Sequence, residues 1–138
     1  MTMYLDKTYK KQEAIFLKQY QPIDVIRSMP YNLGSAIKYL IIAGNSDDLP
    51  DYACARDYLE DVLKEDKGYY KVKLSVDARQ ALSVYVARNN LVAQLFKNWC
   101  DSLNKLKVKK TFITHKDISD VINILDEKLI DYDEANDE

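Results

Sequence analysis

Few residues in this chain can interrupt a helix, and those few are crowded into its first half. The 138 residues include three glycines and three prolines, and neither type occurs after Gly68. Glycine and proline are the strongest breakers of regular structure. The sequence therefore predicts one all-α domain over residues 1–138, a bundle of about six helices, with short helices in the first half and two longer ones in the second.

Signals for common catalytic and metal sites are also scarce. The two cysteines, Cys54 and Cys100, have no CxxC spacing, and the single histidine, His115, is far from both in sequence. A zinc site needs three or four such ligands, so we expect free, buried thiols and a reducing compartment. The glycine-rich phosphate-binding patterns GxxxxGK[ST] and GxGxxG are absent. We predict no catalytic residue, no metal site and no cofactor.

Long apolar runs are missing too. The first residues hold no apolar core of signal-peptide length, and no stretch approaches the roughly 20 apolar residues of a membrane span. We expect a cytoplasmic protein with no membrane partner. A net charge of −2 is not that of a general nucleic-acid binder, which is usually basic. The chain has eleven tyrosines against three phenylalanines. Tyrosine suits half-exposed positions and interfaces, so the sequence is compatible with a homodimer.

Apolar residues at helical spacing predict the first helices. Two helices are expected over residues 8–20 and 22–29. Asn32 should cap a third helix, because its side chain can accept from free backbone N–H groups. Gly44 should end that helix, since glycine is favoured just past a helix C-terminus.

The next helix should begin after Asp47 or Asp48 and have an acidic outer side. Residues 47–66 contain eight acids against two bases. Residues three and four apart lie on one side of a helix. Three of the carboxylates therefore form what we call the acidic face: Asp57, Glu60 and Asp61.

In the second half, the stretch KGYYKVKLS alternates like a strand but has no evident partner, so we interpret it as a linker. Ser75 should open one long helix reaching about Leu106, with an inward set of Ala78, Ala81, Leu82, Tyr85, Val92, Leu95, Phe96, Trp99 and Leu103. Thr114 and Asp117 resemble a capping box for the last helix. Its apolar stripe is Ile118, Val121, Ile122, Leu125 and Leu129.

The second half of the chain also contains two strongly charged stretches, one basic and one acidic. KLKVKK, residues 105–110 and here called the lysine segment, could contact nucleic-acid phosphates or complement the end of the long helix. Its lysines are Lys105, Lys107, Lys109 and Lys110. Residues 131–138 should form an acidic, frayed tail.

Residues 20–64 resemble a small helical domain of tailed-phage early proteins. The matching residues are the runs IDVI at 23–26, LG at 33–34, AIKY at 36–39 and AG at 43–44, then a helix with Ala55 and YLE at 58–60. The family includes a phage nucleotide kinase that phosphorylates deoxynucleoside monophosphates. Its polar pattern is only partly kept: FLKQYQ has no histidine, Ser35 replaces asparagine, and Ile41–Ile42 and Asn45 replace basic residues. The resemblance implies a kept scaffold, lost nucleotide chemistry, and additional helices over residues 75–130.

The hypothesis we favour from sequence is a small phage-type accessory protein that acts by non-catalytic binding. The acidic face would engage a host or phage protein and could inhibit a host defence or nucleic-acid-processing protein. An anti-CRISPR-like role is an analogy only.

Two alternatives belong to other classes. In a nucleotide kinase, Lys38 and Arg56 would contact phosphates and Asp57 or Asp24 would hold Mg²⁺ for ATP. In a nucleic-acid-binding module, the lysine segment would contact the backbone.

Overall fold

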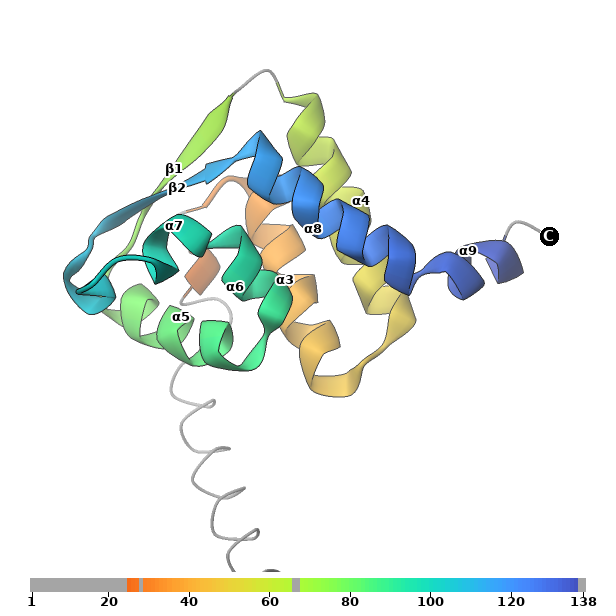
Figure 1. Cartoon of the computed structure of the whole chain (residues 1–138), viewed down its shortest axis with the longest axis horizontal. Helices are drawn as coiled ribbons and strands as arrows, with labels where there is room; N and C mark the ends of the chain where they lie inside the picture. The colour runs from red at the N-terminus through yellow and green to blue at the C-terminus, as the bar shows by residue number, and fades with distance from the viewer. Residues whose placement is uncertain (1–24, 28, 66–67, 137–138) are drawn as a thin grey trace, which may run out of the picture.

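Figure 1 shows the computed structural model of the chain, which describes residues 25–27, 29–65 and 68–136. These residues form seven α-helices, a 3-10 turn and two short strands. The predicted all-α bundle is confirmed, with the two-stranded sheet as an addition. The helix expected over 8–20 and half of the one over 22–29 lie outside the described residues. None of the helices in the described part is long and apolar enough to span a membrane.

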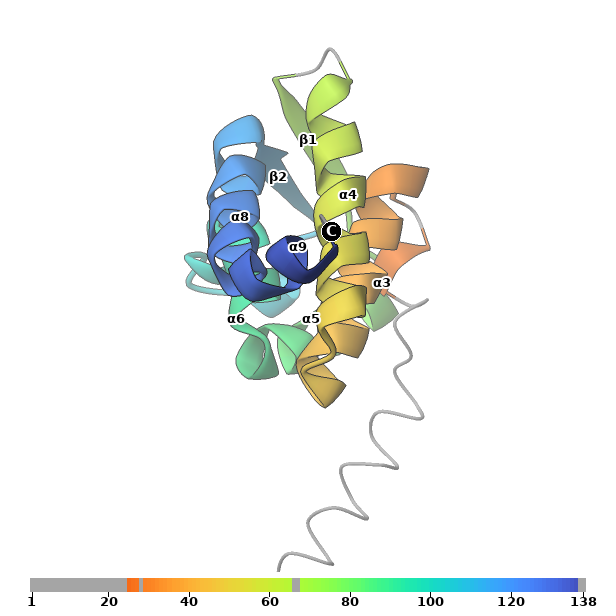
Figure 2. The same ribbon diagram turned by 90° about the vertical axis from the view of Figure 1, so that its right-hand side faces the viewer.

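The first two described helices, α3 (Tyr31–Ser46) and α4 (Leu49–Lys64), run side by side in opposite directions. Asp47 makes the turn between them in the left-handed region, with φ of 53°, and its N–H donates to the Ala43 carbonyl. Each helix buries an apolar stripe, worth roughly 1.5–3 kcal/mol for each large side chain. In Figure 2, α4 lies between α3 and α8. The buried residues include Leu33, Ile37, Leu40, Ile41, Tyr52, Ala55, Leu59 and Val62.

Both predicted ends of α3 are wrong. Asn32 lies inside the helix, which begins at Tyr31 after Pro30, and its amide nitrogen donates to Glu65 Oε1 at 3.2 Å. Gly44 is a helical residue, and the helix continues for two more residues. A Cβ atom on Gly44 would collide with the amide nitrogen of Asn89. Glycine here therefore serves close packing and not helix termination.

The stretch interpreted as a linker is a strand. β1 (Tyr69–Lys73) pairs antiparallel with β2 (Lys110–Thr114), in a register that places Tyr69 opposite Thr114 and Lys73 opposite Lys110. The partner strand was missed because it lies about 40 residues further along the chain. We call these two strands the strand pair. They lie side by side at one edge of the helices (Figures 1 and 2).

Residues 75–106 do not form one long helix. Ser75 does cap a helix, α5 (Val76–Arg88), by accepting from the Ala78 N–H at 3.1 Å. Asn89 then ends it, and its Oδ1 accepts from the N–H groups of Leu91 and Val92. An asparagine side chain can thus interrupt a helix by taking over its backbone N–H groups. The helices that follow are α6 (Asn90–Leu95), α7 (Lys97–Cys100) and the 3-10 turn η1 (Lys105–Lys107).

The contrast between short early and long late helices is also wrong, since α3 and α4, with 16 residues each, are the longest helices of the described part. Leu103, expected to point inward, is fully exposed at 101%. The rest of that inward set is buried, including Phe96 and Trp99. The helical spacing of apolar residues therefore predicted the buried side chains correctly up to α7, and it failed only beyond that helix.

The last long helix, α8 (His115–Lys128), agrees with its prediction. Thr114 Oγ1 accepts from the Asp117 N–H at 3.2 Å, and Asp117 Oδ2 accepts from the Thr114 N–H at 3.1 Å, so the capping box is confirmed. Its predicted apolar stripe is buried as a whole. The tail differs from the frayed one expected, because residues 130–136 form a further helix, α9 (Ile130–Asn136).

Candidate functional site

The strand pair has one buried and one exposed side. Along β1, Tyr70 and Val72 point into the core while their neighbours are exposed, and along β2 Thr111 and Ile113 do the same. This alternation is the period of two expected for strands that cover a core on one side. The exposed side is what we call the basic ribbon face: Tyr69, Lys71, Lys73, Lys110 and Phe112.

The register arranges the basic ribbon face in rows. Lys73 lies opposite Lys110 at one end, Lys71 lies opposite Phe112 in the middle, and Tyr69 lies at the other end. Rows on one side of a strand are spaced by about 7 Å. The two aromatic rings meet edge to face, with centroids 5.4 Å apart and planes at 71°. One end of the face is therefore aromatic and the other is cationic.

The lysine segment adjoins the cationic end. Lys105 and Lys107 lie in η1, and the chain then runs through Lys109 directly into β2. The Leu74 N–H donates to the Lys109 carbonyl at 2.5 Å, which ties this entry to the end of β1. The Lys105 ammonium lies 5.7 Å from the centre of the Trp99 ring. Lysines from two separate stretches of sequence, Lys71 and Lys73 from one and Lys110 from the other, thus lie on one side of the strand pair.

Local charge along the chain supports the same grouping. Residues 68–116 contain ten lysines and arginines against two aspartates, a net charge of +8. Residues 117–138 contain nine acids against one lysine, a net charge of −8. The overall value of −2 hides this division. A window of local charge would have pointed to the basic region, and the β-branched and aromatic residues of KTFIT would have pointed to the second strand.

A pocket lies between α3, α4 and the residues just before α3, and three tyrosines line it. Tyr39 and Tyr58 stack with centroids 5.8 Å apart, and Tyr31 meets Tyr58 edge to face at 6.1 Å. The hydrogen bond with Tyr31 raises the pKa of Tyr58. We call this the tyrosine pocket; its volume is about 690 Å³, and the exposed Lys38 lies on its wall. Its aromatic and apolar lining could hold an apolar or planar group.

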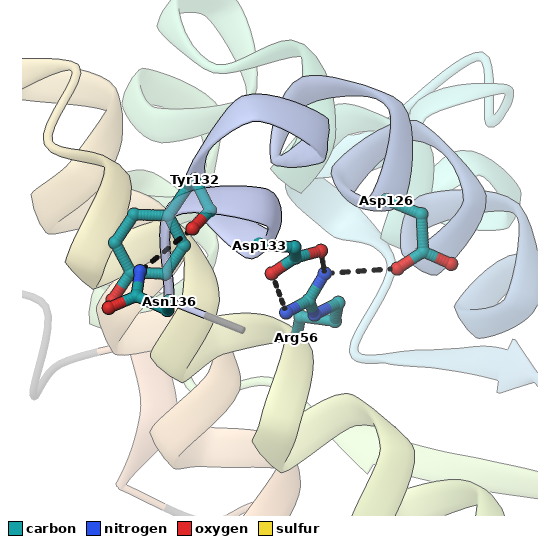
Figure 3. Close-up of polar contacts among 5 residues, drawn as sticks. All are labelled: Arg56, Asp126, Tyr132, Asp133 and Asn136. Atoms are coloured by element: carbon teal, nitrogen blue, oxygen red, sulfur yellow. Dashed lines mark hydrogen bonds and ion pairs between the residues drawn. The ribbon is translucent and has the colours of Figure 1, made fainter. Parts of the chain in front are cut away.

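Arg56 is used inside the fold. Its guanidinium donates to both carboxylate oxygens of Asp133, at 2.7 and 2.8 Å, and to Asp126 at 3.2 Å, as Figure 3 shows. These contacts raise the pKa of Arg56, and the hydrogen bond from Arg56 lowers the pKa of Asp133. Arg56 does not line the tyrosine pocket, so it and Lys38 do not converge on one ligand. Its role in this structure is to hold α9 against α4.

The acidic face is exposed on α4. Asp57, Glu60 and Asp61 are all accessible, and Asp61 lies 3.4 Å from Lys64. In the ranges that the structure describes, no group of three or more histidines, cysteines or acids could hold a metal ion. Cys54 and Cys100 are free thiols, but both are half-buried and not fully buried as expected. Their partial burial still raises the pKa of both thiols, which makes them poor nucleophiles.

Comparisons with protein families, curated proteins and solved structures gave no match to this chain. The resemblance of residues 20–64 to the tailed-phage domain therefore stays an expectation. Of the predicted site residues, the structure places Lys110 of the lysine segment opposite Lys73 and on the same side of the strand pair as Lys71. It separates Lys38 from Arg56.

Proposed function

We propose that this chain is a small, non-catalytic binding protein whose ligand is nucleic acid. The basic ribbon face and the lysine segment would hold the ligand through its phosphates. The observation that supports the proposal is the pairing of β1 and β2, which places Lys73 opposite Lys110 and Lys71 in the next row on the same side. Three exposed lysines on one side of the strand pair, Lys71, Lys73 and Lys110, suit the repeated negative charge of a phosphate backbone.

Salt dependence tests the proposal. Fluorescence anisotropy of a labelled oligonucleotide should report binding that weakens with salt, because lysine–phosphate contacts release counterions. For four contacts to a single strand, the slope of log K against log salt is about −3, or roughly 50-fold between 50 and 200 mM. Absence of binding at 50 mM salt would reject the proposal.

Two double variants that each remove two positive charges test whether the basic ribbon face is the surface that binds nucleic acid. Lys73→Gln with Lys110→Gln should weaken binding about 10-fold and reduce the slope by about 1.4, since two phosphate contacts are lost. Lys38→Gln with Lys64→Gln removes two exposed lysines from α3 and α4 and should change affinity less than about 2-fold. Equal losses in the two pairs would mean that net charge matters and the basic ribbon face does not.

A partner protein bound by the acidic face is a second candidate, and it is the hypothesis favoured from sequence. Its support is the exposure of Asp57, Glu60 and Asp61 on one helix. A host or phage partner follows from the resemblance, and an anti-defence role rests on analogy. Capture from a host lysate by the wild type and by a variant with all three acids changed to lysine would test it. Identical sets of captured proteins would reject the acidic face as the interface.

The kinase alternative has less support in this geometry. It required Lys38 and Arg56 to share a phosphate ligand, with Mg²⁺ held by Asp57 or Asp24, and Asp24 lies outside the described residues. The Arg56 guanidinium is instead engaged by Asp133 and Asp126. Incubation with labelled ATP and each deoxynucleoside monophosphate would test this alternative, and transfer to any of them would revive it.

A further inference from the structure

We infer that the nucleic acid bound by the basic ribbon face is single-stranded, with unpaired bases stacked on Tyr69 and Phe112. This inference rests on the proposed function and adds the class of ligand. It starts from the two aromatic side chains at one end of the face, which lysines alone would not explain.

Both rings are accessible although a core lies directly beneath their strands. Tyr69 is 57% exposed and Phe112 is 44% exposed, while Tyr70 and Ile113, which follow them in the chain, are buried. Exposed aromatic side chains on a rigid sheet offer flat surfaces for stacking, and base stacking on such rings tolerates any sequence.

Two sets of contacts fix the positions of Tyr69 and Phe112, the pair of rings that we call the platform. The strand register fixes the relative positions of the two rings, which meet edge to face. The Asn98 amide nitrogen donates to the Phe112 carbonyl at 2.9 Å, which ties β2 to α7. A base that stacks here would not have to order the platform first, so little affinity is lost to that ordering.

The composition of the face favours a single strand over a duplex. A two-stranded ribbon can enter a major groove, where base edges are read by arginine, lysine, asparagine and glutamine side chains. Of these types, β1 and β2 contain only lysine, which also suits phosphates, so the aromatic rings decide between the two ligands. In a duplex the faces of the bases are covered by their neighbours, so Tyr69 and Phe112 would find no stacking partner. In a single strand the bases reach the aromatic end while phosphates reach the lysines.

An anionic lipid surface is the competing ligand class. Leu103 and Leu106 are exposed, at 101% and 55%, beside the lysines of the lysine segment. Apolar side chains next to cationic ones can insert at a membrane interface. Nucleic acid is favoured because the aromatic residues lie on a rigid strand pair, where a flat stacking surface is preserved. Lipid vesicles are therefore one arm of the test.

The test compares ligands by anisotropy at constant salt. The ligands are a mixed-sequence single strand of about 12 nucleotides, the matching duplex, and heparin as a polyanion without bases. Vesicles of phosphatidylglycerol and phosphatidylcholine are measured by co-sedimentation. We expect the single strand to bind most tightly. Equal affinity for single strand, duplex and heparin would overturn stacking but leave the proposed function standing, and tighter binding to vesicles would overturn both.

Variants of the rings complete the test. Tyr69→Ala and Phe112→Ala should each lower affinity for the single strand by about 5- to 150-fold, the range found for stacked bases, and leave affinity for heparin unchanged. Tyr69→Phe and Phe112→Tyr keep an aromatic ring and should retain binding, which guards against misfolding as an explanation. Tyr31→Ala removes a more exposed ring, which belongs to the tyrosine pocket, and should have no effect. A loss in the Tyr31 variant equal to that of Tyr69→Ala would contradict the inference.

Discussion

Two glycines in the same helix should respond in opposite ways to alanine. Gly34 and Gly44 both lie in α3, and neither has a positive φ. A Cβ on Gly34 would lie 3.4 Å from the nearest atom, Ile26 Cβ, which is an ordinary contact. A Cβ on Gly44 would collide with the amide nitrogen of Asn89. The outcome at Gly44 therefore depends on what it costs to move Asn89.

The sizes of these opposing contributions decide whether each substitution stabilises or destabilises the fold. Alanine exceeds glycine in helix propensity by about 1 kcal/mol, so Gly34→Ala should raise the free energy of unfolding by up to that amount. Displacing Asn89 breaks its 2.7 Å hydrogen bond to the Leu40 carbonyl, worth about 1 kcal/mol. It also disturbs the cap on α6, worth about another 1 kcal/mol. Gly44→Ala should therefore lower the free energy of unfolding by about 1 kcal/mol net.

Urea unfolding followed by circular dichroism measures both changes. With a slope near 2 kcal/mol per molar urea, each change moves the midpoint by about 0.5 M, in opposite directions. In an Asn89→Ala background the obstacle is gone, and Gly44→Ala should become stabilising by about 1 kcal/mol. The coupling between the two positions is then about 2 kcal/mol. If Gly44→Ala has the same effect in both backgrounds, the reasoning about Asn89 is refuted.

Three further predictions concern other contacts. Asp133→Asn should speed amide hydrogen exchange in α9, and Asp131→Asn should not. Because Arg56 lowers the pKa of Asp133 below its usual 3.8, this protection should be present above that pH and be lost as the pH falls below it. Tyr70→Phe should cost about 1 kcal/mol at pH 7. Burial and a hydrogen bond raise the pKa of this phenol from 10 to about 12, so the phenol of the unfolded chain ionises first. Urea unfolding should therefore show the difference persisting to about pH 10 and being lost above it, before pH 12 is reached. Thr114→Ala should lower stability to urea by about 1 kcal/mol, while Thr114→Ser stays near the wild type.

Features that depend on neighbours in sequence could be predicted. The capping box of Thr114 and Asp117 and the apolar stripe of α8 follow from spacings of three and four residues, and both are confirmed. Ser75 likewise opens a helix as expected. The helix break at Asn89 was missed, because no glycine or proline marks it and because Asn89 looks in the sequence like any polar surface residue.

Features that depend on distant pairing could not be predicted. The alternation in β1 was visible, but a strand is stable only with a partner, and that partner is some 40 residues away. The lysine segment was identified as a candidate site, whereas Tyr69, Lys71, Lys73 and Phe112 join it only through that pairing. Arg56 suited a phosphate contact by charge, and its actual partner, Asp133, is 77 residues further on.

The distance between the two strands also bears on when the candidate surface comes into being. Residues 74–109 form a closed loop between β1 and β2, and closing a loop of this length costs on the order of 3 kcal/mol of chain entropy. Local helices form without that cost, so we expect the strand pair to form late in folding, once α5 to α7 have drawn its ends together. A partly folded chain would have every one of the lysines but not their arrangement. A ligand of this surface would therefore bind only the completed fold, and would stabilise it by an amount that grows with the logarithm of the ligand concentration once this exceeds Kd.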